Sequence, residues 1–187
     1  MLKEIERTVD ELLRGNTILY PTDTIWGIGC DAENAAAVRK VYAIKERPRD
    51  QSFIILVSDA NMLKHYVKEI PDGFFNFRSG QDRPTTYVFK EARNLPEDLV
   101  RSDGSVGIRV VQDDFCQELI QRFGRAIVST SANISGGETT ASFKEIPQAI
   151  LEKVDYVVNW RQEEDIAEKP SRIVKWQPNG NVKVIRD

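Results

Sequence analysis

Residues 19–32 read LYPTDTIWGIGCDA and are followed at residues 45–48 by KERP. Residues 17–20 are predicted to form a short buried strand, and hydroxyl-bearing residues and glycines follow at its end. Such residues contribute little to the packing of an apolar strand. From Arg39 to Arg49 there are five basic residues and a single acid, although the whole chain has a formal net charge of −3. This local reversal of sign indicates a phosphate-binding pocket.

A second polar cluster, STSANISGG at residues 129–137, follows a predicted apolar strand. Ligand sites of α/β sheets favour the carboxyl ends of strands, so the two clusters predict one pocket. Arg109 lies on another predicted strand, where a charge is costly unless it reaches water or meets an anion. Each feature also has a purely structural explanation: Lys45 and Arg47 could complement a helix dipole, and Thr22 could cap a turn.

Outward from these clusters, helical and strand patterns alternate without a linker. Helices are predicted at 5–13, ended by Gly15, at 31–44, at 59–68 and at 114–123, and Ser142 with Glu145 has the spacing of a capping box for a late helix. Asn179-Gly180 predicts a closing hairpin. Strands are predicted at 17–20, 53–57, 85–89, 106–111, 126–128, 156–160, 173–176 and 182–185. This order predicts one α/β domain, residues 1–187, with a mixed sheet flanked by helices.

Composition bounds the function classes. A chain of 187 residues with 41% hydrophobic residues is typical of one soluble globular domain, and no apolar run approaches a membrane span. The first residues carry no signal-peptide core, so we expect a cytoplasmic location. Two cysteines and one histidine predict free thiols and no zinc site. A pI of about 5.4 argues against a protein that holds nucleic acid by bulk positive charge.

Five segments carry the polar motifs: PTDTIWGIGCDA (21–32), KERP (45–48), GIR (107–109), STSANISG (129–136) and PSRIV (170–174). In this order and spacing they resemble the YrdC/TsaC family of threonylcarbamoyl-AMP synthases, over nearly the whole chain. The sequence departs from the family pattern at Trp26, Leu56, Arg83 and Arg172, where tyrosine, histidine, glycine and threonine are respectively frequent.

The resemblance implies a twisted mixed α/β sheet with a concave basic face, in the short form of the family without an extra C-terminal domain. It implies a nucleotidyltransferase that converts L-threonine, bicarbonate and ATP, with Mg²⁺ bound to the ATP, to threonylcarbamoyl-AMP and pyrophosphate. The product would feed formation of threonylcarbamoyladenosine in tRNA, with the protein partners of that transfer and with weak contact to tRNA itself.

The resemblance also implies site residues. The chemistry needs positioning and charge stabilisation rather than a protein nucleophile, so no catalytic side chain and no protein metal site are predicted. ATP would be bound by Lys45, Arg47, Gln51, Thr86, Arg109 and Ser171. Threonine would be bound by Thr22, Ser131 and Asn133.

Two alternatives remain open at this point. One is a related carbamoyl-adenylate enzyme, like the YrdC-like domain of hydrogenase maturation proteins. The other is a non-catalytic RNA-binding module that uses the same basic concavity. A pyrophosphate-release assay with ATP, with and without threonine and bicarbonate, distinguishes all three.

Overall fold

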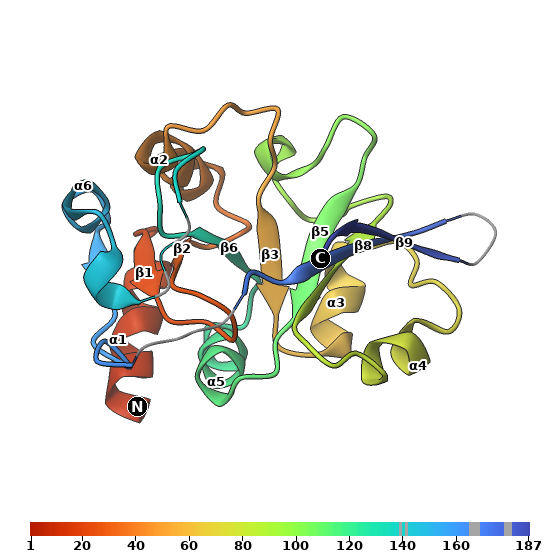
Figure 1. Ribbon diagram of the computed structural model, residues 1–187, viewed down its shortest axis with the longest axis horizontal. Helices are drawn as coiled ribbons and strands as arrows, with labels where there is room; N and C mark the ends of the chain where they lie inside the picture. The colour runs from red at the N-terminus through yellow and green to blue at the C-terminus, as the bar shows by residue number, and fades with distance from the viewer. Residues whose placement is uncertain (139, 141, 165–168, 178–180) are drawn as a thin grey trace.

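The computed structural model describes residues 1–138, 140, 142–164, 169–177 and 181–187. Their strands form one sheet in the order β7-β1-β2-β6-β3-β5-β4-β8-β9, which runs across the whole molecule (Figure 1). The strands are β1 (Ile18–Tyr20), β2 (Gly27–Gly29), β3 (Ile54–Val57), β4 (Thr85–Phe89), β5 (Val106–Val110), β6 (Ile127–Ser131), β7 (Tyr156–Val157), β8 (Arg172–Trp176) and β9 (Val182–Arg186).

The sheet is mixed, as the sequence predicts. Strand pairs β1–β7, β3–β5 and β4–β8 are parallel, whereas β1–β2, β2–β6, β3–β6, β4–β5 and β8–β9 are antiparallel. The two arms of the predicted C-terminal hairpin do pair, but its Asn179-Gly180 turn lies outside the described residues. The polar ends of β1 and β6 are brought together by β2, which lies between these two strands.

Helices cover both faces of the sheet. On one face, α2 (Ala35–Lys45), α3 (Ala60–Tyr66) and α4 (Phe74–Ser79) contribute to a core that also contains Ile55 and Ile108. On the other face, α1 (Leu2–Leu13) and α5 (Asp114–Phe123) enclose a smaller core with Tyr20 and Leu56. Neighbouring residues of β3, Ile55 and Leu56, enter different cores because side chains alternate along a strand.

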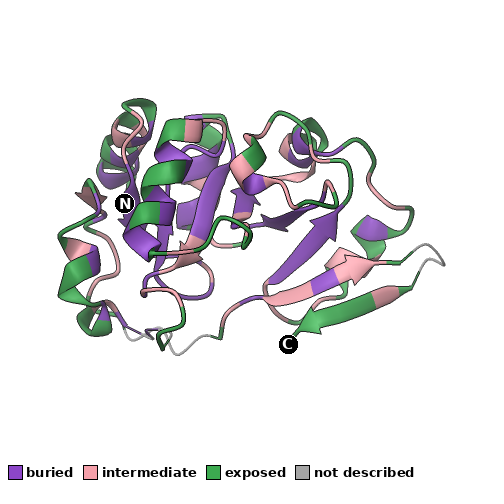
Figure 2. Ribbon diagram, turned by 90° about the horizontal axis from the view of Figure 1, so that it is seen from above, coloured by how far each residue is buried: buried purple, intermediate pink, exposed green. Residues whose placement is uncertain are grey.

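Helix ends follow local chemistry. The Asn34 side chain accepts hydrogen bonds from the amides of Ala36 and Ala37, so α2 begins at Ala35 and not at residue 31 as predicted. The Asp59 side chain caps α3 in the same way, and Gly124 adopts a φ of 78° where α5 ends. Figure 2 shows that burial falls off towards β9, which forms one edge of the sheet.

Several predicted elements differ from the structure. Residues 27–29 form a strand that the sequence did not indicate, and α4 was missed as well. Ser142 precedes a short 3-10 turn at Phe143–Glu145 and makes no side-chain cap, because α6 (Gln148–Leu151) begins only after Pro147. Strand β7 stops at Val157 and does not reach residue 160.

Glycines let β2 enter the sheet. A Cβ atom at Gly29 would lie 2.5 Å from the Val128 carbonyl oxygen and 2.7 Å from the Tyr20 ring. A side chain there would therefore push β2 away from its neighbours. A Cβ atom at Gly27 would lie 3.3 Å from Ser129 Oγ. These two glycines of the motif therefore permit close packing between neighbouring strands.

Candidate functional site

A cavity of about 200 Å³ opens where the motif segments meet. Its walls come from the residues after β1, the segment between α2 and β3, the segment before β5, strands β5 and β6, and the C-terminal residues beside β8 and β9. It is lined by Thr22, Thr24, Ile25, Trp26, Gly27, Arg47, Ser52, Phe53, Ile54, Arg101, Arg109, Ser129, Thr130, Ser131, Pro170, Ser171, Ile173 and Arg186. Segments distant in sequence thus form one site, as the two polar clusters predict.

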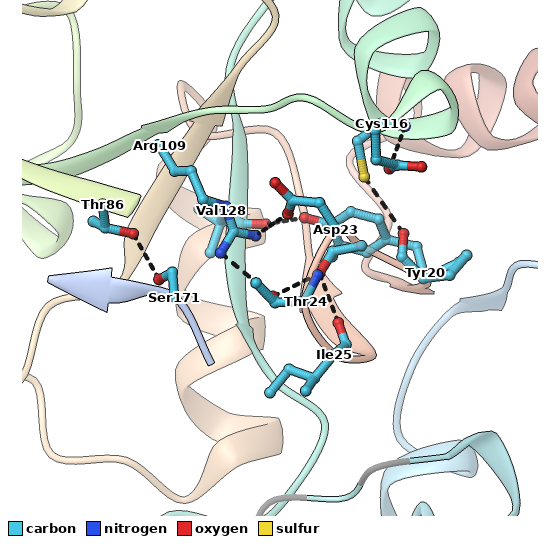
Figure 3. A network of polar contacts seen from close by, with 12 residues as sticks. Tyr20, Asp23, Thr24, Ile25, Thr86, Arg109, Cys116, Val128 and Ser171 are labelled. Atoms are coloured by element: carbon cyan, nitrogen blue, oxygen red, sulfur yellow. Dashed lines mark hydrogen bonds and ion pairs between the residues drawn. The ribbon is translucent and has the colours of Figure 1, made fainter. Parts of the chain in front are cut away.

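Arg109 is buried on β5 and reaches this cavity, with 2% of its surface exposed. Its Nη2 lies 2.9 Å from Asp23 Oδ1, and its Nη1 donates a 3.4 Å hydrogen bond to Thr24 Oγ1 (Figure 3). Burial raises the pKa of Asp23, while the Arg109 charge opposes that rise. Asp23 was not among the predicted site residues, although a carboxylate within the PTDT motif is a signal for a partner of the predicted arginine.

The threonines after β1 form a tight hydroxyl turn. Thr22 Oγ1 donates to the Ile25 carbonyl at 2.7 Å and accepts from the Thr24 amide at 3.1 Å. The Thr22 and Thr24 hydroxyls are 3.0 Å apart. The structural role suggested by the sequence is therefore real, and both side chains also line the cavity. Contact of Thr22 with threonine stays a prediction.

Arg47 lines the cavity from the segment that follows α2. Its Nε donates to the Gln51 carbonyl at 2.8 Å, its Nη2 donates to the Ser52 carbonyl at 3.3 Å, and its guanidinium lies 5.1 Å from the Phe53 ring centroid. Burial lowers the pKa of Arg47 from its ordinary value, and the charge of Arg101 lowers it further. Gln51 contributes its backbone to this arrangement, while its side chain is exposed and does not line the cavity.

Lys45 lies behind the cavity wall. Its Nζ donates to the Ser131 carbonyl at 2.7 Å, to Asn133 Oδ1 at 2.9 Å and to the Asn133 carbonyl. Burial lowers the pKa of Lys45 to about 8, with a smaller contribution from the charge of Arg47. In this arrangement the ammonium group fixes the loop after β6, and its predicted contact with ATP is not tested.

The loop after β6 is held by its own side chains as well. Ser131 Oγ donates to Asn133 Oδ1 at 2.5 Å, and Asn133 Nδ2 donates to the Gly137 carbonyl at 2.7 Å. Ser131 lines the cavity, whereas Asn133 is buried behind it with Lys45. The structure thus places one of the two predicted loop contacts on the cavity surface.

The C-terminal segment closes the remaining side. Ser171 lines the cavity, and its hydroxyl shares a 2.8 Å hydrogen bond with Thr86 Oγ1, which is buried behind it (Figure 3). Arg186 donates to the Ser171 carbonyl through Nη2 at 2.7 Å and also lines the cavity. Arg172, a departure from the family pattern, pairs instead with Asp187 at 2.7 Å.

Sequence reasoning missed two arginines of this cavity, Arg101 and Arg186. Arg186 directly follows the predicted strand 182–185, and a cation at the end of a strand was a signal that could have identified it. Arg101 precedes a predicted strand and had no signal of its own. Leu56, the other departure, is buried beside Arg109 in the sheet register and packs in the smaller core.

The described residues contain no cluster of three or more histidine, cysteine, aspartate or glutamate side chains that could hold a metal ion. Cys30 and Cys116 are buried free thiols, and burial raises the pKa of both. No helix among the described residues is long and apolar enough to cross a membrane.

The fold and the site define a single-domain α/β protein with an arginine- and hydroxyl-lined cavity at the ends of β1, β2 and β6. Residues 10–187 match the Sua5/YciO/YrdC family model, which is described as telomere recombination. The chain belongs to this family, and the family resemblance seen in the motifs is confirmed.

Individual proteins of known sequence or structure support this family membership. The threonylcarbamoyl-AMP synthase of Pseudoalteromonas translucida is 35% identical over 151 residues, which are 79% of this chain and 81% of that protein. The crystal structure of E. coli YciO superposes with a TM-score of 0.86 at 23% identity and covers 100% of this chain and 90% of that chain. P. abyssi Sua5, crystallised with L-threonine, superposes with a TM-score of 0.84 at 23% identity. That match covers 97% of this chain but only 53% of the Sua5 chain, so this chain spans about half of that protein.

Proposed function

We propose that this protein is an L-threonylcarbamoyladenylate synthase, a nucleotidyltransferase that makes threonylcarbamoyl-AMP and pyrophosphate from L-threonine, bicarbonate and ATP. The proposal is supported by the 35% identity to a protein of that name over about four fifths of both chains. The observation that carries it is the cavity itself, where four arginines and several hydroxyl groups line one small space. This combination suits a polyanionic nucleotide together with a small polar amino acid.

The reaction requires the protein to position its substrates and does not require covalent catalysis by a side chain. The threonine amine adds to the carbon of bicarbonate, and loss of water gives a carbamate. A carbamate oxygen then attacks the α-phosphorus of ATP, and the bond from that phosphorus to the bridging oxygen breaks as pyrophosphate leaves. Negative charge is present on both reactants throughout, so arginines that hold them at short distance would lower the barrier.

The cavity offers two kinds of position for these charges. Arg109 is buried at its inner end beside the Thr22 and Thr24 hydroxyls, which suits the compact carboxylate end of threonine or the α-phosphate. Arg47 also lines the cavity but is only half-buried, so it suits phosphate oxygens. Ser131 and Ser171 add hydroxyl groups to the lining of the same cavity. Thr86 would act through Ser171, and Lys45 and Asn133 would act through the loop that carries Ser131.

Mg²⁺ would accompany ATP. Protein-bound Mg²⁺ usually keeps several waters and is held by phosphates with one or two carboxylates. Among the described residues that line the cavity there is no carboxylate, so Mg²⁺ would be held there mainly through the ATP phosphates. Phosphate oxygens and water would be the main ligands of Mg²⁺. The arginines would neutralise the negative charge of the phosphates that Mg²⁺ leaves uncompensated.

A pyrophosphate-release assay tests the function. Purified protein with MgATP should release pyrophosphate only when threonine and bicarbonate are both present, and the AMP product should carry the mass of threonylcarbamate. Pyrophosphate release that does not depend on threonine would support a related carbamoyl-adenylate activity. An inactive protein that binds tRNA would support the RNA-binding module. Omission of bicarbonate is the matched control, because carbonate-free buffer leaves the ATP and threonine sites unchanged.

The place of this reaction in the cell is part of the same proposal. A mixed anhydride of a carbamate and AMP hydrolyses readily, so the product would pass soon to the proteins that transfer threonylcarbamoyl to tRNA in the cytoplasm. Contact with tRNA would be weak, because the chain has a net charge of −3 and its arginines converge on one small cavity.

A further inference from the structure

Arginines outnumber acids in the cavity. Four arginines line it, Arg47, Arg101, Arg109 and Arg186, and the structure pairs only Arg109 with a carboxylate. Within the described ranges, the other three make no ion pair with an aspartate or glutamate. Cations gathered at one cavity without acids repel one another, so this arrangement favours an anion between them.

Arg101 is the least expected of these residues. It is half-buried in the segment between the 3-10 turn Glu97–Leu99 and β5, and its Nε donates a 3.1 Å hydrogen bond to Ser52 Oγ. Its charge lowers the pKa of Arg47 more than the neighbouring Asp50 raises it. Arg47 also donates a hydrogen bond to Ser52, through Nη2 to its carbonyl, so the two guanidinium groups are neighbours in the cavity lining.

The segment of Arg101 is anchored to the segment of Arg47. Asp98 accepts hydrogen bonds from Arg39 Nε at 3.1 Å and from Arg49 Nη1 at 3.4 Å. The Tyr42 hydroxyl lies 2.8 Å from the Asp98 carbonyl and 3.3 Å from the Gln51 carbonyl. These contacts hold residues 97–101 against residues 46–52, so the position of Arg101 is set before any ligand binds.

A purely structural role explains Arg101 poorly. A single hydrogen bond to the Ser52 hydroxyl could be made by a shorter, uncharged side chain at lower entropic cost. A guanidinium that is half-buried next to another guanidinium gains nothing structurally from its charge. A bound anion between the two guanidinium groups would account for this charge.

The geometry also separates two ends of the cavity. Arg109 is buried at the inner end among hydroxyls, whereas Arg47 and Arg101 are half-buried nearer to solvent. A pyrophosphate unit keeps part of its hydration and its metal ion, so it suits the more open end. Building on the proposed synthase function, we propose that Arg101 binds the β- and γ-phosphates of ATP together with Arg47 and stabilises pyrophosphate as it leaves.

The test is calorimetric binding of MgATP, Mg-pyrophosphate, AMP and L-threonine to the wild type and to Arg101→Gln. Loss of one charge-assisted contact should weaken ATP and pyrophosphate binding about 10- to 100-fold. AMP and threonine should bind as they do to the wild type. Arg101→Lys should recover part of the pyrophosphate affinity, because lysine keeps the positive charge but cannot form bidentate hydrogen bonds to phosphate.

Arg93→Gln is the matched control, since Arg93 is exposed and lies outside the cavity walls. It should leave all four affinities unchanged. Equal weakening of AMP, threonine and pyrophosphate in Arg101→Gln would overturn the proposal in favour of a structural role. Unchanged pyrophosphate binding in that variant would also overturn it while leaving the synthase function standing. A wild type that neither binds nor releases pyrophosphate would overturn both proposals.

Discussion

Replacement of Lys45 by methionine should destabilise the fold at the loop after β6. Methionine is close to lysine in length and apolar, so it can occupy the same buried space. It cannot donate, and the Ser131 and Asn133 carbonyls would lose their ammonium donor. Asn133 Oδ1 would keep its hydrogen bond from Ser131 Oγ.

The magnitude follows from those acceptors. A buried acceptor without a donor costs about 1 to 3 kcal/mol, so two lost partners would cost about 2 to 6 kcal/mol. Removing a buried charge offsets part of this cost, and the lowered pKa of Lys45 shows that the charge is desolvated. We therefore expect a loss of about 2 to 3 kcal/mol in the free energy of unfolding at pH 7. Lys40→Met, which breaks one exposed pair with Asp155, should cost less than about 1 kcal/mol.

Guanidinium denaturation at several pH values gives the measurement. Lys45 has a pKa of about 8 in the folded protein and an ordinary value of 10.5, so above pH 8 the unfolded chain binds the extra proton. This group therefore makes the wild type more stable as pH rises from 8 towards 10.5, by at most about 1.4 kcal/mol per pH unit. Lys45→Met should lack this rise. Equal stability of the two lysine variants at pH 7, with parallel pH profiles, would refute the reasoning.

Three further outcomes are expected. Asp23→Asn should lower the free energy of unfolding by about 3 kcal/mol, because it leaves the buried Arg109 charge without its partner. In a double-mutant cycle followed by denaturation, Asp23→Asn with Arg109→Gln should lose less stability than the sum of the two single changes. If the synthase proposal is right, valine should be a poorer substrate than serine, and Ser131→Ala should raise the KM for threonine more than the KM for ATP; a defect seen only in the ATP titration would move Ser131 to the nucleotide side. Binding to tRNA should be weak and fall steeply with salt in gel shift, whereas a tight salt-insensitive complex would contradict the charge argument.

The sequence predicts most of the fold because most elements have a local cause. Helix α5 has an apolar stripe, an Asp113 cap and a closing Gly124, and its predicted bounds are confirmed. Strand β4 is likewise confirmed at 85–89. Strand β2 was missed because its GIG sequence has low strand propensity, and only the close approach of Val128 and Tyr20 favours glycine there.

Helix α4 was missed for a related reason. Its residues Phe74–Ser79 contain aromatic side chains that favour strands, and its six residues are too few to show a helical period. Phe74 packs its ring against Tyr87 and Phe89 of β4, with centroid distances of 4.8 and 5.3 Å. This tertiary packing stabilises the helix, and the local sequence pattern does not show it.

The sequence predicts which segments form the site, but it does not predict which atoms of those segments face the cavity. Charge reversal and hydroxyl runs at strand ends identify the segments, and the structure joins these segments around one cavity. Which atom of a segment faces the cavity depends on backbone hydrogen bonds that no local pattern specifies. Gln51 shows this, since its carbonyl anchors Arg47 while its side chain is exposed.

Lys45 and Arg47 show why neighbouring cations of one motif need separate tests. They are two residues apart at the end of α2, where the left-handed Glu46 (φ 51°) turns the chain between them. The turn places the Lys45 ammonium among loop carbonyls and leaves Arg47 on the cavity wall. Loss of activity on changing Lys45 would therefore combine a displaced Ser131 with any lost phosphate contact. A phosphate role for this motif is tested more cleanly at Arg47, provided that stability is measured alongside affinity.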